Sequence, residues 1–251
     1  MKKLTIALLA LALCGGLVIA GAIAMEGNLS NQKERASGQW RYKMTVTVET
    51  PEGEITGSAV REMGNATPRV NLPDVGNPAD VRGEAVVVDM GDRGVLFALI
   101  SHASDLEFYN TFPVPGHPIG VGGSSSAGIE YYSNLPVGTK AEMPSDFPPG
   151  YPKLVTFTDI SDPKTVTLAQ VWARQEQGLY TLKGGRMEEL FGEGGELKSI
   201  ELEITDEPVT WGVVDEYLPW LKDIKSNIDG TNITNSNELH NNLHKGNFKR
   251  D

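Results

Sequence analysis

The sequence predicts a mainly β (α+β) protein: a single antiparallel β-sandwich or barrel-like domain with two short C-terminal helices, preceded by one N-terminal hydrophobic helix. Three observations predict this fold class. Apolar and polar residues alternate from 40 to 50, two short β-branched runs follow at 85–90 and 95–100, and apolar residues take helical spacing only after residue 212. Period two is typical of a half-buried strand, whereas spacings of three and four are typical of an amphipathic helix.

The N-terminal helix is predicted from an uncharged apolar stretch between Leu4 and Ala24. Its 21 residues would span roughly 31 Å as a helix, which matches a hydrocarbon core of about 30 Å. Lys2 and Lys3 precede it, and the positive-inside rule then puts the N-terminus in the cytoplasm. We therefore expect a signal anchor in the lipid bilayer: a single-pass inner-membrane protein with its body in the periplasm.

Two alternatives for the leader stay open. Residues 22–24 form a small-x-small cleavage site, so the body could instead be secreted to the periplasm after cleavage at Ala24. Cys14 resembles the lipidated cysteine of a bacterial lipobox, although Leu13 stands where a small residue is usual. All three interpretations export the body, which gives a leader at 1–24, a polar linker at 25–38 and a β-rich soluble domain at 39–251.

Composition narrows the classes of partner and chemistry. The 33 acidic against 22 basic residues give a formal net charge of −11, which argues against nucleic acid and anionic lipid headgroups as main partners because both need a basic surface. Cys14 is the only cysteine, so thiol catalysis, CxxC redox chemistry and cysteine zinc sites are excluded from the body. An exported domain without disulfides is typical of a bacterial envelope.

Three hairpins and two further strands are expected in chain order. The alternating strand at 40–50 turns at 51–53 and returns at 54–63 as a hairpin, after which 64–83 is read as loop. The runs at 85–90 and 95–100 are nearly continuous in apolar residues, which predicts a hairpin of central strands buried on both faces. A third hairpin pairs 153–159 with 164–172, and further strands are expected at 178–185 and 198–204.

The region 112–152 is rich in Pro, Gly and Ser, and it is read as a long loop. One short strand is expected inside it at 129–133. The two tyrosines of this strand, Tyr131 and Tyr132, are the candidate contact residues for a ligand or partner, because aromatic loop residues make good contact anchors.

Two helices are expected near the C-terminus. Apolar residues at spacings of three and four predict an amphipathic helix over 213–224, which Pro219 should kink or open. A second helix is expected at 237–245, with Ser236 as N-cap and Gly246 following it.

Several stretches of the body carry a resemblance to a known family. They are WRYKMTVTVETPEGEITGSAVRE at 40–62, GEAVVVDMGDRGVLFAL at 83–99, YPKLVTFTDISDPKTV at 151–166, EITDEPVTWG at 203–212, EYLPWL at 216–221 and LHKGNFKR at 243–250. Together they resemble a family of bacterial membrane-associated proteins of unknown function. The resemblance implies a short membrane-associated bacterial protein, and it implies no activity, cofactor or catalytic residue.

Candidate catalytic residues are few, and each has a plainer interpretation. The serine run at 124–126 does not complete G-x-S-x-G, and no helix pattern follows it. His240 and His244 lie four apart on the expected last helix, so they are weak candidates for a metal site, but the glutamate of H-E-x-x-H is missing. Asp159 with Asp162 is read as a turn pair, and the carboxylates at 188–189 as a polar stretch.

Because none of these candidate catalytic motifs is complete, the sequence favours a non-enzymatic binding or structural module on the periplasmic side of the membrane. We expect no cofactor, no nucleic acid and a possible protein partner in the envelope, met through Tyr131 and Tyr132. The alternative is a periplasmic hydrolase that uses carboxylates or a metal site at His240 and His244.

Overall fold

A long β-hairpin forms the middle of the largest sheet, and it confirms the first predicted hairpin. β1 (Ser37–Thr50) and β2 (Gly53–Ala66) pair along their whole lengths. Every second residue of β1 from Trp40 onward is buried, as period two requires. A two-residue turn at 51–52 leads into Gly53, whose φ of +121° disfavours any residue with a Cβ.

This computed structural model describes residues 36–67, 79–100, 106–119, 123–145, 151–174, 180–233 and 236–251. Residues 36–251 pack as one compact unit, and β1 begins inside the predicted linker at 25–38. In the described part of the chain, no helix combines the length and hydrophobicity needed to cross a membrane. The stretch between Leu4 and Ala24, with Cys14, lies outside the described residues, so its predictions stay open.

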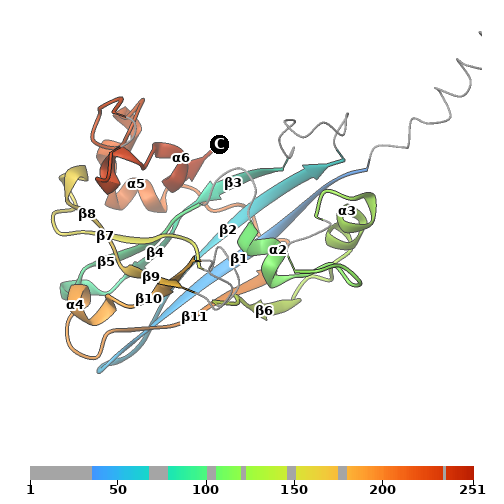
Figure 1. The fold of residues 1–251 in the computed structure, drawn as a ribbon, viewed down its shortest axis with the longest axis horizontal. Helices are drawn as coiled ribbons and strands as arrows, with labels where there is room; N and C mark the ends of the chain where they lie inside the picture. Colours follow the sequence, from blue (N-terminus) through green and yellow to red (C-terminus); the bar gives the residue numbers. More distant parts are fainter. Residues whose placement is uncertain are drawn as a thin grey trace, which may run out of the picture. The chain divides into compact units, whose positions relative to one another are not determined.

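The largest sheet has six antiparallel strands (Figure 1). Their order is β12 (Lys249–Arg250), β3 (Asp80–Glu84), β2, β1, β11 (Glu196–Ile204) and β6 (Lys140–Glu142). β11 pairs with β1 through eight residue pairs, with one register shift between Thr47 and Val48. The predicted loop at 64–83 is wrong at both ends, because β2 continues to Ala66 and β3 starts at Asp80.

A second antiparallel sheet has four strands. Their order is β4 (Val86–Asp89), β5 (Val95–Ala98), β7 (Leu154–Phe157) and β8 (Val166–Leu168). The predicted β4–β5 hairpin is confirmed, and its turn contains a 3₁₀ helix at Gly91–Arg93.

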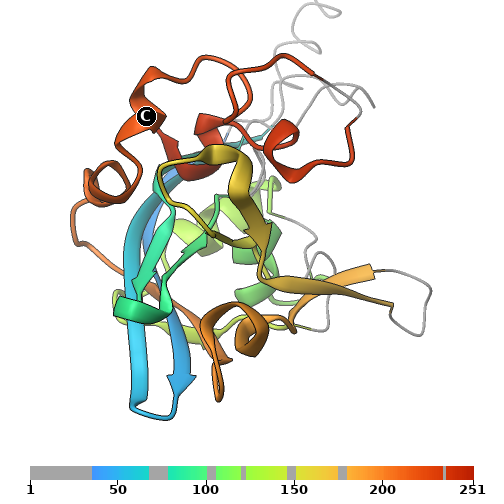
Figure 2. The ribbon, with the colours of Figure 1, turned by 90° about the vertical axis from the view of Figure 1, so that its left-hand side faces the viewer.

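The second sheet is buried on both faces, as its continuous apolar runs predicted. One face shares an inter-sheet core with the six-stranded sheet, which includes Tyr42, Val46 and Ile200 together with Val88 and Leu96. The other face shares a C-terminal core with the end of the chain, which includes Phe97, Val155, Leu218, Leu243 and Phe248. Figure 2 shows the second sheet between the long hairpin and the C-terminal segment.

The fold is therefore mainly β, with antiparallel sheets and few helices, as predicted. Both sheets keep open strand orders within the described residues, so the barrel-like alternative is wrong.

Two helices lie beside and inside the region 112–152, for which the sequence predicts a long loop. α2 (Leu106–Thr111) precedes it, and α3 (Ser126–Ser133) replaces the strand expected at 129–133. Ser125 caps α3 by accepting a hydrogen bond from the backbone N–H of Gly128. The strand prediction failed because Ile129 and Tyr132, which are buried, lie three apart on one helix face.

The strand expected at 164–172 divides at the buried Ala169. β8 ends before it and pairs with β7, whereas β9 (Gln170–Arg174) pairs with β10 (Tyr180–Gly184) as a separate two-stranded sheet. The short helix α4 (Met187–Phe191) follows β10 and had no signal in the periodicity.

The C-terminal helices differ from prediction. The first is split into α5 (Val213–Tyr217) and a 3₁₀ helix at Pro219–Asp223, which starts at its proline. The helix expected at 237–245 is wrong: a 3₁₀ helix at Leu239–Asn241 is followed by α6 (Lys245–Phe248). Asn242 explains part of this, because its side-chain amide donates to the Ser236 and Glu238 carbonyls and so competes with helical hydrogen bonding.

Candidate functional site

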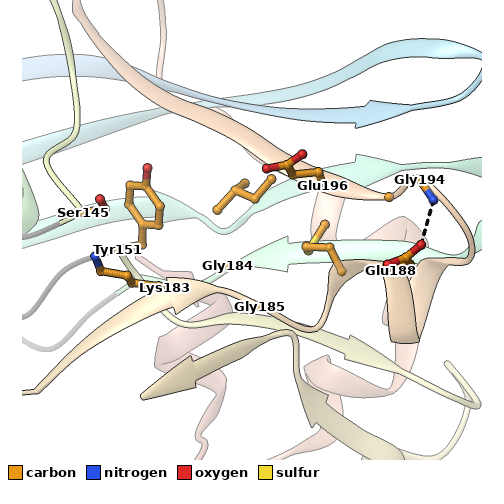
Figure 3. A pocket seen from close by; sticks show the side chains of 11 residues that line it. Ser145, Tyr151, Lys183, Gly184, Gly185, Glu188, Gly194 and Glu196 are labelled. Carbon is orange, nitrogen blue, oxygen red and sulfur yellow. Dashed lines mark hydrogen bonds between the residues drawn. The ribbon is translucent and has the colours of Figure 1, made fainter. Parts of the chain in front are cut away.

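A hollow of about 470 Å³ opens between the end of β10, α4 and the start of β11 (Figure 3). We call it the β10–β11 hollow. It is lined by Ser145, Tyr151, Lys183, Gly184, Gly185, Met187, Glu188, Gly194, Gly195, Glu196 and Leu197. Its volume falls in the range of about 300–1,000 Å³ that is usual for ligand sites.

Glycines give this hollow a wall of bare backbone. A Cβ on Gly184 would lie 3.0 Å from the Leu197 Cβ, and a Cβ on Gly185 would lie 2.6 Å from a Val171 methyl carbon. Gly194 has a φ of +72°, and a Cβ there would lie 2.7 Å from the Pro51 ring. Because none of these positions has room for a Cβ, the glycines let the main chain pack closely against Leu197, Val171 and Pro51.

Two strand edges meet at the hollow. β10 pairs with β9 alone in the described part of the chain. On its side away from β1, β11 pairs with β6 only through 201–203, so among described residues the stretch 196–199 has no strand partner on that side. Exposed edges present N–H and C=O groups to any extended segment that comes near.

Charge is divided along the hollow. Figure 3 shows Lys183 with Ser145 and Tyr151 at one end, and Glu188 beside Gly194 at the other. The carboxylate of Glu188 accepts a hydrogen bond of 3.4 Å from the Gly194 backbone N–H. The exposed Glu196 lies between the two ends on β11.

Apolar side chains also line the hollow. Met187 is buried, and the half-buried Leu197 packs against the inter-sheet core. The lining of the hollow is therefore part charged and part apolar.

Arg186 and Glu189 fix the start of α4 next to the hollow. The guanidinium donates from Nε and Nη2 to the two carboxylate oxygens of Glu189 at 2.9 and 2.6 Å, and from Nη1 to the Leu168 carbonyl at 2.9 Å. The Arg186 hydrogen bonds hold the pKa of Glu189 below its ordinary value. The arginine is thus engaged by its own helix and by β8.

The structure does not bring His240 and His244 onto one helix face. His240 lies in the 3₁₀ helix, with Nε2 3.8 Å from an Asp229 carboxylate oxygen, and His244 is the N-cap of α6, where its N–H donates to Asn247 Oδ1. The prediction of a shared face is wrong because the 3₁₀ helix ends before His244, whose backbone is extended. No group of three His, Cys, Asp or Glu side chains that could hold a metal occurs among the described residues.

Tyr132 is a core residue in this structure. Its side chain is 1% exposed and its hydroxyl donates to the Phe112 carbonyl at 2.9 Å, and burial raises its pKa. The half-buried Tyr131 packs against it at a ring-centroid distance of 5.1 Å. Tyr132 therefore offers no surface to a partner, and a contact role stays a prediction for Tyr131 alone.

The remaining candidates have local structural roles. Ser125 caps α3, so the expectation that no helix follows the serine run is wrong. Asp159 accepts from the hydroxyl and N–H of Ser161, and these hydrogen bonds lower its pKa. Asp162 accepts from the Lys164 N–H and caps the 3₁₀ helix at Pro163–Thr165, which confirms the turn interpretation.

No protein-family model matches the sequence, and the searches of curated proteins and of solved structures return no match either. The resemblance to a bacterial membrane-associated family stays a prediction.

Sequence reasoning missed the β10–β11 hollow, although a signal for it was present. Two glycine doublets, at 184–185 and 194–195, bracket a short acidic helix. Paired glycines beside strands indicate close approach of two backbones or of a ligand.

Proposed function

We propose that this chain is a non-enzymatic envelope module, tethered to the membrane by its leader, whose body binds an extended peptide segment of a partner in the β10–β11 hollow. The observation that carries the proposal is that two strand edges, neither with a strand partner at this point among the described residues, meet at a hollow lined by glycines. In strand addition, main-chain hydrogen bonds supply affinity and alternate side chains supply specificity. The two sheets act as a rigid β-sandwich scaffold for this site.

The location rests on the leader. An apolar stretch of 21 residues behind two lysines suits a single-pass anchor that leaves the body in the periplasm. Cleavage at Ala24 would leave the same body free in the periplasm, and it would change the tether without changing the hollow.

Site-specific photo-crosslinking in cells tests the proposal. A benzophenone amino acid at Glu196 should cross-link to one partner segment, whereas the same group at Val137, which is 63% exposed and does not line the hollow, should not. A synthetic copy of the cross-linked segment should then bind the purified full chain, with affinity falling at least tenfold when alternate backbone nitrogens are methylated.

N-methylation removes the donors that strand addition needs, without removing side chains. Equal cross-linking at both positions would contradict the proposal. So would affinity that is indifferent to N-methylation.

A further inference from the structure

A second hollow, of about 490 Å³, lies on the face of the six-stranded sheet that points away from the inter-sheet core. We call it the Gly64 hollow. β1, β2 and β3, which Figure 1 shows side by side, form its floor. Its lining includes Ser37, Gln39, Glu62, Gly64, Asp80 and Arg82.

Strand register puts Gly64 at the centre of this hollow. Gln39 of β1 is paired with Gly64 of β2, which is paired with Asp80 of β3. The next pair along the hairpin, Trp40 with Met63, belongs to the inter-sheet core, so the Gly64 row faces the other way. Neighbouring strands lie about 4.8 Å apart, so Gln39 and Asp80 stand about 10 Å apart with no side chain between them. This gap is wide enough for one sugar ring.

Among the described residues, nothing requires glycine at position 64. Gly64 lacks a positive φ, no bulge interrupts the pairing of β1 with β2, and a Cβ there would lie 3.7 Å from the Gln39 Cγ, which is ordinary van der Waals contact. Gly38 differs, because a Cβ there would lie 2.1 Å from the Ser133 Oγ. Glycine weakens a strand interior and often marks the close approach of a ligand. Gly64 therefore indicates that a ligand uses the space above it.

The polar groups around Gly64 both donate and accept hydrogen bonds. The side chains of Ser37, Gln39 and Asp80 are exposed and make no hydrogen bond or ion pair with a described residue. An Arg82 guanidinium nitrogen lies 3.7 Å from a Glu62 carboxylate oxygen, which is longer than a hydrogen bond. Both groups therefore keep hydrogen-bonding capacity for a ligand.

This lining suits a neutral ligand rich in hydroxyl groups. The two carboxylates disfavour an anion, and the guanidinium between them disfavours a cation. No aromatic side chain occurs among the described residues that line the hollow, so a quaternary ammonium group would find no ring to contact. Hydroxyl groups donate to carboxylate and amide oxygens and accept from amide and guanidinium groups.

We propose that the Gly64 hollow binds one ring of a neutral saccharide. This site is separate from the β10–β11 hollow and does not depend on peptide binding there.

Saturation-transfer NMR on the purified full chain tests the proposal, in a detergent without a sugar headgroup. Cellotetraose, maltotetraose and the tetramer of N-acetylglucosamine are the probes. They are used at millimolar concentration, because an open site with few hydrogen bonds binds weakly. At least one of them should receive saturation from the protein.

The variant Gly64→Thr supplies the decisive comparison. The threonine side chain would fill the hollow and should abolish the saccharide signal, whereas the urea midpoint should stay equal or rise, because β-branched residues favour strands. The matched control Ser58→Thr adds a methyl group on the same face of β2, outside the hollow, and should keep the signal. If Gly64→Thr does not fold, Gln39→Ala should reduce the signal about threefold or more, because one hydrogen-bonding side chain is lost.

Three outcomes would overturn the proposal. The first is no saturation of any of the three probes. The second is a signal that Gly64→Thr leaves unchanged, since the saccharide would then bind elsewhere. The third comes from tetralysine as a rival probe: a tetralysine signal that Gly64→Thr removes, without a saccharide signal, would assign the hollow to a cationic ligand.

Discussion

Glu84 is a fully buried carboxylate that joins three separate parts of the chain. Its two oxygens accept from the backbone N–H groups of Gly212 (2.7 Å) and Val214 (3.2 Å), at the start of α5. The ammonium of Lys249 lies 3.4 Å away and also bonds Asp215 at 2.5 Å. Buried charges persist only where they are paired and hydrogen-bonded, and Glu84 meets both conditions.

Replacing Glu84 by glutamine should lower the free energy of unfolding by about 1–3 kcal/mol, because one backbone donor and the Lys249 charge lose their acceptor. Urea unfolding of the full chain in detergent measures this. The matched control is Glu216→Gln, which is exposed on α5 and should change stability by less than about 0.5 kcal/mol. Equal midpoints for the two variants would show that the buried network contributes nothing.

Asp229 provides a pH dependence of stability. Burial opposes its ionisation, but hydrogen bonds from the Thr231 N–H and hydroxyl outweigh this and lower the pKa of Asp229. A lowered folded-state pKa adds stability above the unfolded pKa of about 3.9, and this stability is lost as pH falls through the folded-state pKa.

The variant Asp229→Asn should therefore be less stable than the unaltered chain at pH 7, with a difference that shrinks below about pH 4. Urea midpoints at pH 7, 5 and 3 check this, with the exposed Asp223→Asn as control. A difference that stays constant over the three pH values would refute the role given to the Asp229 charge.

At the scale of elements, the sequence predicted the long strands correctly, whereas it did not predict the short helices. β1 and β11 alternate over many residues, so their period was visible in the sequence. α3, α4 and α6 have four to eight residues, too few turns to show a period of 3.6. Their ends depend on local hydrogen bonds such as the Ser125 cap.

The site was unpredictable for a different reason. Lys183 and Glu196 belong to separate sheets. The strand expected at 164–172 divides at Ala169, so β9 pairs with β10 and does not continue the pairing of β8 with β7. Single strands were predictable from their side chains, whereas the angle between two sheets depends on packing across many segments.

Tyr132 tests the new assignment of α3. Tyr132→Phe should cost about 0.5–1.5 kcal/mol of stability, because the Phe112 carbonyl loses its hydrogen-bond donor, and it should leave peptide binding unchanged. Thermal unfolding measures the first effect, and binding of a synthetic copy of the cross-linked segment measures the second. Loss of binding without loss of stability would restore the contact role predicted for the tyrosine pair.

At the scale of the whole molecule, the second sheet couples the two cores. Leu96 of β5 faces the inter-sheet core, and its neighbour Phe97 faces the C-terminal core. Phe97 packs edge-on against Phe248 at a ring-centroid distance of 6.1 Å. A substitution that destabilises the C-terminal core should therefore also destabilise the inter-sheet core on the other side of β5.

Phe248→Ala should lower the free energy of unfolding by about 3–5 kcal/mol, and both cores should lose stability together. Near-ultraviolet circular dichroism and tryptophan fluorescence should report one common transition, since Trp40 lies in the inter-sheet core and Trp220 packs against the C-terminal core. Two separated transitions would mean that the cores unfold independently.

The position of β1 between β2 and β11 has a consequence for biosynthesis. β1 and β2 leave the ribosome early, but β11 ends only at Ile204. At about 5–20 residues per second, the partner of β1 arrives roughly 10–30 s later. Throughout that delay a 14-residue strand lacks the partner of one of its sides, and an unpaired strand edge can pair with other chains.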